Sequence, residues 1–176
     1  MTKVNESQFQ EACFQWANAN SNRVFSKFAQ DWGWESWVQV ELASFLNEKL
    51  PADFHLQREA NIFRGRKRVD LLLNTNYAAR FQIPVEIKTQ TKLGGLNFII
   101  EVQKDMQKLY ASRARNYKDS HCAMVVMVVD QGAVAALNQV TWDGTGQVFF
   151  VVPTSDKQFA IGFSWLTDGQ WGIWIG

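Results

Sequence analysis

Two acidic side chains and one lysine occur inside apolar, branched stretches of this chain. Asp70 belongs to the run VDLLL, and Glu86 and Lys88 belong to the run PVEIK. Burying a carboxylate costs free energy unless an opposite charge or a cation compensates it. Two neighbouring carboxylates also repel each other, and a divalent cation relieves that repulsion. The residue types therefore indicate a site for a divalent metal ion beside a lysine.

The two runs predict neighbouring β-strands. Residues 69–73 and 81–87 are short, apolar and rich in branched side chains, and the NTN segment between them indicates a turn. Side chains alternate along a strand, so Glu86 and Lys88 point to the same face, roughly 6.6 Å apart. If the two strands pair, Asp70 lies beside Glu86.

A helix over residues 35–50 precedes these strands and offers further acids. Its apolar stripe consists of Trp34, Val38, Leu42, Phe45 and Leu46, and Pro51 ends it. Glu41 falls inside the stripe, so we expect it to face the interior and take a catalytic role. The alternative is that it meets an arginine such as Arg68 or lies at the edge of the stripe. Glu35 is explained most simply as a helix-start residue that the helix dipole favours.

Basic side chains lie close to both acidic runs. The tract just before Asp70 contains Arg64, Arg66, Lys67 and Arg68. It is either a set of phosphate contacts or a solvated turn. A helix predicted over residues 97–115 carries Lys104 and Lys108 on its polar face. That face is either only solvated or contacts a nucleic-acid backbone.

The remaining pattern predicts an α/β protein. We expect a helix over 5–18 that breaks at the NANSN segment before a second short helix. The other expected elements are strands over 54–63, 123–129, 147–152, 159–166 and 171–175 and a short helix over 132–140. We expect Trp165, Trp171 and Trp174 to cover one side of the sheet rather than to stack on bases.

Length and composition favour one domain over residues 1–176. The chain is 47% hydrophobic and 20% charged, as in ordinary globular proteins, and its net charge of +1 argues against a general basic coat for nucleic acid. Cys13 and Cys122 form no metal-ligand pattern and no disulfide framework, which favours a reducing cytoplasm. The longest apolar run, 123–129, is too short to span a bilayer, so no membrane partner is expected.

The order of these parts resembles the PD-(D/E)XK nuclease superfamily. The residues that carry the resemblance are Asp70 in RVDLLL and Glu86 and Lys88 in VEIKTQ, with Glu41 as the first-helix acid and Glu35 as its rival. The resemblance covers about residues 34–130. It implies a restriction-endonuclease-like core, a mixed β-sheet flanked by helices. The N-terminal helices and a C-terminal β-hairpin are extensions outside that core.

The resemblance implies a metal-dependent nuclease that hydrolyses phosphodiester bonds, in DNA rather than RNA. Asp70, Glu86 and the backbone carbonyl of Ile87 would hold Mg²⁺ or Mn²⁺. Lys88 would orient or help deprotonate the attacking water and stabilise the developing charge. Glu41 would hold a second metal ion or a metal-bound water, and Gln90 would position the phosphate. Arg64, Arg66, Lys67, Arg68, Lys104 and Lys108 would contact the nucleic acid.

Two other interpretations stay open at this point. The same fold could belong to a catalytically silent binding protein, such as an immunity or assembly partner or a homodimer, because the net charge is low and the C-terminus is aromatic. Alternatively, Asp70 and Glu86 simply pair with Arg66 and Arg68 across the sheet, which would make the site structural.

Overall fold

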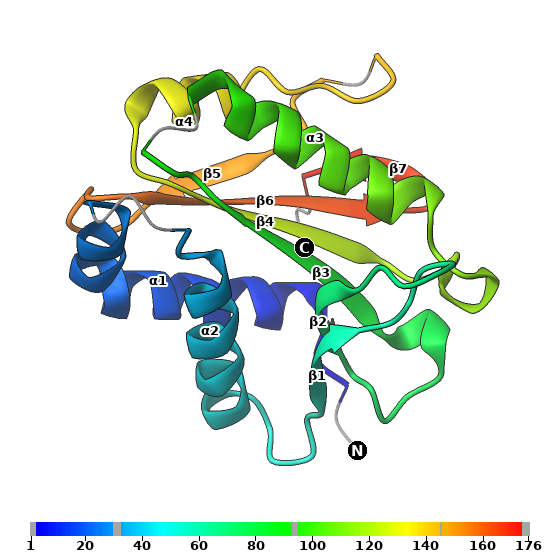
Figure 1. Cartoon of the computed structure of the whole chain (residues 1–176). Helices are drawn as coiled ribbons and strands as arrows, with labels where there is room; N and C mark the ends of the chain where they lie inside the picture. The colour runs from blue at the N-terminus through cyan, green and yellow to red at the C-terminus, as the bar shows by residue number, and fades with distance from the viewer. Residues whose placement is uncertain (1–2, 30–32, 93–94, 145, 174–176) are drawn as a thin grey trace.

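One mixed β-sheet between two layers of helices forms the framework of the protein (Figure 1). The structure is a computed structural model that describes residues 3–29, 33–92, 95–144 and 146–173. Within these residues seven strands form the sheet, in the order β1-β2-β3-β4-β6-β5, with β7 beside β6. The predicted α/β class with a mixed sheet and flanking helices is therefore confirmed.

The elements follow one another in the order α1-α2-β1-β2-β3-α3-β4-α4-β5-β6-β7. The helices are α1 (Glu6–Ala29), α2 (Glu35–Lys49), α3 (Gly95–Ala111) and α4 (Gln131–Leu137). The strands are β1 (Leu56–Ala60), β2 (Val69–Leu73), β3 (Ile83–Thr89), β4 (Cys122–Val128), β5 (Phe150–Pro153), β6 (Ala160–Thr167) and β7 (Gln170–Gly172).

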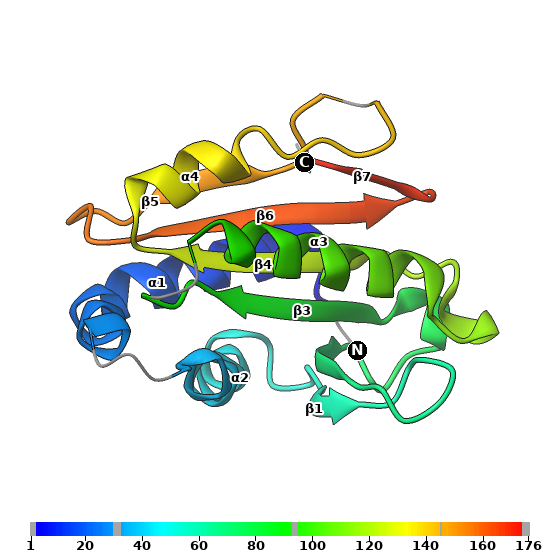
Figure 2. The ribbon, with the colours of Figure 1, turned by 45° about the horizontal axis from the view of Figure 1, so that its top comes forward.

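The centre of the sheet combines antiparallel and parallel pairs. β1, β2 and β3 form antiparallel neighbours, whereas β3 and β4 run parallel. A parallel pair needs a crossover connection, and α3 provides it. Every residue of β4 is buried, as its continuous apolar sequence predicts for a strand covered on both faces. The crossover places α3 along β3 and β4, as Figure 2 shows.

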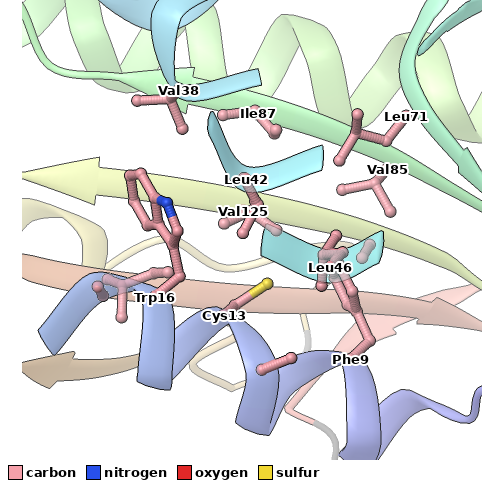
Figure 3. Close-up of a cluster of buried hydrophobic side chains, with 14 of the residues drawn as sticks. Phe9, Cys13, Trp16, Val38, Leu42, Leu46, Leu71, Val85, Ile87 and Val125 are labelled. Carbon is pink, nitrogen blue, oxygen red and sulfur yellow. The ribbon is translucent and has the colours of Figure 1, made fainter. Parts of the chain in front are cut away.

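Two hydrophobic clusters lie on opposite faces of the sheet. On one face, α1 and α2 pack against alternate strand residues such as Leu71, Val85 and Val125 (Figure 3). On the other face, α3 and α4 cover the intervening residues, including Met124 and Val126. Strand side chains that alternate with those facing α1 and α2 therefore lie under α3. Glu86 and Lys88 belong to that set, because their partners in β4 are Met124 and Val126.

Helix α1 does not break at residues 18–22, so this prediction was wrong. The polar side chains there find partners without leaving the helix. The amide of Asn18 donates to the Phe14 carbonyl and that of Asn20 to the Trp16 carbonyl. Ser21 hydrogen-bonds Asp156 in the turn between β5 and β6. These local hydrogen bonds and the tertiary contact of Ser21 offset the weak helix propensity of the NANSN segment.

The remaining predicted elements are present with shifted ends. The strand expected over 54–63 is shorter, and the strand expected over 147–152 begins later, at Phe150. Trp165 and Trp171 are almost completely buried against the sheet, but they belong to the clusters on its two opposite faces and not to one side as predicted. Trp174 lies outside the described residues. No helix in the described ranges combines the length and apolar character needed to cross a membrane.

Candidate metal centre

Asp70 and Glu86 lie opposite each other on neighbouring strands. β2 pairs with β3 so that Leu71 faces Val85, and this register, continued by one residue, brings Asp70 beside Glu86. The backbone N–H of Ile87 donates to Oδ2 of Asp70 at 2.7 Å, which fixes the Asp70 carboxylate against β3. The strand pairing predicted from the sequence is thus confirmed. The side chain of Ile87 points to the other face, into the core under α1 and α2.

The Glu86 carboxylate is buried, and only one of its oxygens is paired. Glu86 is 2% exposed. Its Oε2 accepts a hydrogen bond from Nζ of Lys108 at 2.7 Å. Its Oε1 is inaccessible to solvent and has no hydrogen-bond partner among the described residues. A buried carboxylate oxygen without a partner costs free energy, so this atom is the feature of the site that most needs a cation.

Burial gives both carboxylates an elevated pKa. Desolvation raises the pKa of Glu86 to about 9, and the neighbouring Asp70 contributes to the rise, against the opposing effect of Lys108. Desolvation likewise raises the pKa of Asp70 to about 7, although the Ile87 N–H opposes it. Paired carboxylates with raised pKa values are typical of sites that bind a cation or transfer protons.

Lys88 lies between two carboxylates from different helices. Its Nζ is 3.2 Å from Glu35 of α2 and 3.1 Å from Asp105 of α3. Partial burial lowers the pKa of Lys88, but the charges of Glu35 and Asp105 outweigh this, and the net effect raises the pKa. Glu35 and Asp105 therefore favour the charged form of Lys88 and hold its ammonium group between α2 and α3.

Gln90 is buried and makes structural hydrogen bonds, and its contact with phosphate stays a prediction. β3 ends at Thr89, and Oε1 of Gln90 accepts the backbone N–H groups of Val129 and Asp130. The carbonyl of Gln90 accepts the indole N–H of Trp34 at 2.8 Å. This last bond ties the start of α2 to the end of β3, and it thereby brings Glu35 to Lys88.

Glu41 does not point inward to the site, and the alternative, a position at the edge of the stripe beside an arginine, is the one that the structure shows. Oε2 of Glu41 lies 2.8 Å from Nη1 of Arg23 on α1, and the Glu41 side chain is 32% exposed. Glu41 lies at the edge of the apolar stripe and forms an ion pair with an arginine. That arginine is Arg23 and not Arg68, the example given from the sequence. Glu35, the rival acid at the helix start, occupies the place at Lys88 that we expected for a helix acid.

The basic residues divide into two groups. Arg64, Arg66, Lys67 and Arg68 are exposed in the loop between β1 and β2, near Asp70 in the chain. Lys104 is also exposed and pairs with Glu101. Lys108 is not on a solvated face, because its side chain is 19% exposed and pairs with Glu86. In the part of the chain that the structure describes, the partner of Glu86 is thus Lys108, not Arg66 or Arg68.

Sequence reasoning missed Asp105 and assigned Lys108 to the wrong environment. Both residues border the buried stripe of α3 formed by Val102, Met106 and Leu109. A helix that connects two parallel strands must pack on their sheet. Polar residues beside its apolar stripe are therefore close to the strand residues beneath, and this signal could have identified both.

A cleft of about 380 Å³ opens beside Lys88. It lies between the start of α2, the end of β3 and the first turns of α3, and Glu35, Lys88 and Glu101 are among its lining residues. The cleft gives a ligand access from solvent to the lysine of the site.

The oxygen atoms of the site suit a hard divalent cation. No three His, Cys, Asp or Glu side chains of the described residues already form a metal cluster. The fit of a cation to this site therefore rests on the carboxylates of Asp70 and Glu86, whose Oε1 is unpaired among the described residues. Mg²⁺ commonly binds through one or two carboxylates and keeps several waters, so this small donor set is compatible with it.

Comparisons with protein-family models, with curated proteins and with solved structures found no match to this chain.

Proposed function

We propose that this protein is a metal-dependent phosphodiester hydrolase of the PD-(D/E)XK type that acts on nucleic acid, with DNA as the preferred substrate. The observation that carries the proposal is the buried, unpaired Oε1 of Glu86 beside Asp70, two residues before a fixed lysine. An apolar core would not retain such an atom for stability alone, because its desolvation is not compensated.

The order of elements supports a restriction-endonuclease-like core. The series α2-β1-β2-β3-α3-β4 has three antiparallel strands, a crossover helix and a parallel fourth strand. Asp70 lies at the second strand and Glu86 and Lys88 at the third, which is the arrangement that the sequence resemblance implies. The helix before these strands supplies an acid, Glu35, to the same site.

The chain's own residues have separable roles in this proposal. Asp70 and Glu86 would hold Mg²⁺ or Mn²⁺, and this ion would supply a Lewis acid for activating water and neutralising phosphate charge. Lys88 donates to a phosphate oxygen and stabilises the charge that develops there. Glu35 and Asp105 orient the Lys88 ammonium group and keep it protonated. Lys88 therefore acts as a cation in this mechanism and not as the base that deprotonates water.

Two surfaces near the site suit a nucleic-acid backbone. The cleft beside Lys88 admits a phosphate group from solvent. The exposed basic tract, which precedes Asp70 in the chain, offers cations that fit phosphates without reading sequence. A local basic tract is compatible with a net charge of only +1, because backbone contacts need a patch and not a uniformly basic surface.

A cleavage assay with matched variants tests the proposal. Plasmid DNA, linear DNA and RNA are incubated with the protein and Mn²⁺, and parallel samples contain EDTA. We expect cleavage that needs Mn²⁺ and that falls by at least about a hundredfold in Asp70→Asn and Lys88→Met. Glu41→Gln is the control for Glu35→Gln, because both acids lie on α2 with side chains 32% exposed.

The Glu41→Gln variant should retain full cleavage activity, whereas the Glu35→Gln variant should lose part of it. Absence of cleavage on all three substrates, combined with no rise in melting temperature on adding Mn²⁺, would contradict the proposal.

A catalytically silent binding protein with the same fold is the second candidate. It is favoured by the ion pairs of Lys88 with Glu35 and Asp105, which satisfy the lysine without any substrate. Such a network would hold α2 and α3 on the sheet and leave the outer surface to recognise a protein. In that case Asp70→Asn would not change Mn²⁺ binding, and no preparation would cut nucleic acid.

A further inference from the structure

A second lysine, Lys108, lies inside the site rather than on its rim. It comes from α3, and its Nζ is 2.7 Å from Oε2 of Glu86 and 3.7 Å from Oδ1 of Asp105. Its side chain is 19% exposed, almost the same fraction as that of Lys88.

The position of Lys108 is fixed by three contacts. The ammonium group lies over the ring of Phe63, 5.2 Å from the ring centroid, where a cation is attracted by the π-system. Glu86 holds it from β3 and Asp105 from its own helix. Since Asp105 also binds Lys88 at 3.1 Å, its carboxylate connects the two lysines. A freely moving surface lysine would not have this set of partners.

The charges of the site leave room for one divalent cation. Four carboxylates (Asp70, Glu86, Glu35 and Asp105) and two ammonium groups (Lys88 and Lys108) leave two negative charges when all are ionised. A single divalent ion balances these charges, whereas a second one would leave an excess of positive charge.

The hydrogen bonds of the Glu86 oxygens also indicate room for one divalent cation. Lys108 takes Oε2, and only Oε1 is left without a partner among the described residues.

We propose that Lys108 stands in for a second divalent cation on Oε2 of Glu86 and so limits the site to one metal ion. The inference rests on the proposed function, because it assumes that Asp70 and Glu86 bind a metal. Lys108, which the sequence predicted to contact nucleic acid, is in this proposal a permanent cation of the metal centre. Lys108 thus repels a divalent ion from one side of Glu86 and directs it to the side of Asp70.

Removing the Lys108 charge should strengthen metal binding. A divalent ion is repelled by an ammonium group about twice as strongly as a proton in the same position, by Coulomb's law. Neutralising Lys108 therefore favours the metal more than it favours protonation of Glu86. The vacated Oε2 also becomes available as a ligand, so a second ion can share the carboxylate.

Mn²⁺ titration of the metal-free protein tests this inference without any cleavage assay. Calorimetry gives the number and affinity of bound ions, and electron paramagnetic resonance shows whether two ions are coupled. The variants are Lys108→Met and Lys108→Gln as two neutral replacements and Lys108→Arg as a charge-preserving one. Lys49→Met is the matched control, because Lys49 also lies over a phenylalanine ring, 5.6 Å from the centroid of Phe45.

We expect the wild type, Lys108→Arg and Lys49→Met to bind one Mn²⁺. A neutral Lys108 variant that folds should bind either a second ion or the first ion about tenfold more tightly. Two ions in the wild type, or unchanged number and affinity in the neutral variants, would overturn the inference alone. Both the inference and the proposed function fail if the wild type binds no Mn²⁺. They also fail if the wild type binds Mn²⁺ but Glu86→Gln binds it equally well.

Discussion

Replacing Glu86 by glutamine should make the metal-free protein less sensitive to alkaline pH. Glu86 is 2% exposed, and its Oε1 has no hydrogen-bond partner in the described part of the chain. Burial, reinforced by Asp70, raises the pKa of Glu86 to about 9 from an ordinary value near 4.5. The folded state therefore keeps a proton on Glu86 at neutral pH, whereas the unfolded state has lost it.

The sign of the effect follows from this difference in bound protons. A folded pKa above the unfolded one means that stability falls as pH rises from about 4.5 until it passes about 9. One proton contributes a slope of about 1.4 kcal/mol per pH unit. Between pH 7 and 9, where the folded form begins to lose its proton, Glu86 should cost the wild type about 2 kcal/mol. Glutamine carries no charge and does not contribute this loss.

Urea unfolding at pH 6, 7, 8 and 9 in the presence of EDTA measures the effect. Tryptophan fluorescence is a suitable signal, since the chain contains eight tryptophans. The free energy of unfolding of the wild type should decline more steeply with pH than that of Glu86→Gln. Glu41→Gln, whose carboxylate is partly exposed and paired with Arg23, should follow the wild type. Parallel pH curves for the wild type and Glu86→Gln would refute the reasoning.

Three further predictions test the packing, the side-chain hydrogen bonds of Gln90 and the basic tract. Leu42→Ala should lower the free energy of unfolding by about 2–5 kcal/mol, because Leu42 is completely buried between α2 and the sheet (Figure 3); a loss below about 1 kcal/mol in urea unfolding would contradict this. Gln90→Ala should cost about 2 kcal/mol in the same assay, because two backbone N–H groups lose their acceptor, and an unchanged midpoint would exclude that role. Arg66→Ala should weaken DNA binding uniformly across sequences and reduce the salt dependence of binding by about one phosphate contact; an unchanged salt slope in fluorescence anisotropy would exclude the contact.

The core of the sheet could be predicted because each strand has a distinct local signal. The fully apolar sequence of β4 predicts burial on both faces, and alternation in β3 places Glu86 and Lys88 on one face. Pairing of β2 with β3 then brings Asp70 beside Glu86. These inferences need only the period of the strand and a short connection.

The position of the α2 acids relative to the site depended on contacts that no local pattern reveals. Glu35 reaches Lys88 because the Trp34 indole binds the carbonyl of Gln90, 56 residues further along the chain. From the sequence alone, Glu35 resembles any acid at a helix start. Glu41 occupies a stripe position, but it turns to Arg23 on α1, a helix whose position beside α2 the sequence did not indicate.

Helix α1 shows the same limit for backbone structure. The NANSN segment has poor helix propensity, which predicted a break. Asn18 accepts hydrogen bonds from the backbone N–H and hydroxyl of Ser155, and Ser21 binds Asp156, both in the β5–β6 turn. These partners lie more than 130 residues away in the chain, so local propensity could not include their effect.

Diffraction from crystals soaked in Mn²⁺ tests the central claim, that Asp70 and Glu86 form a divalent metal centre, most directly. The anomalous signal of manganese locates the ion without reference to activity. We expect one peak, in contact with Asp70 and with Oε1 of Glu86, and no peak in Glu86→Gln crystals. A wild-type protein with no peak at this position, or with its peak at other residues, would contradict the claim.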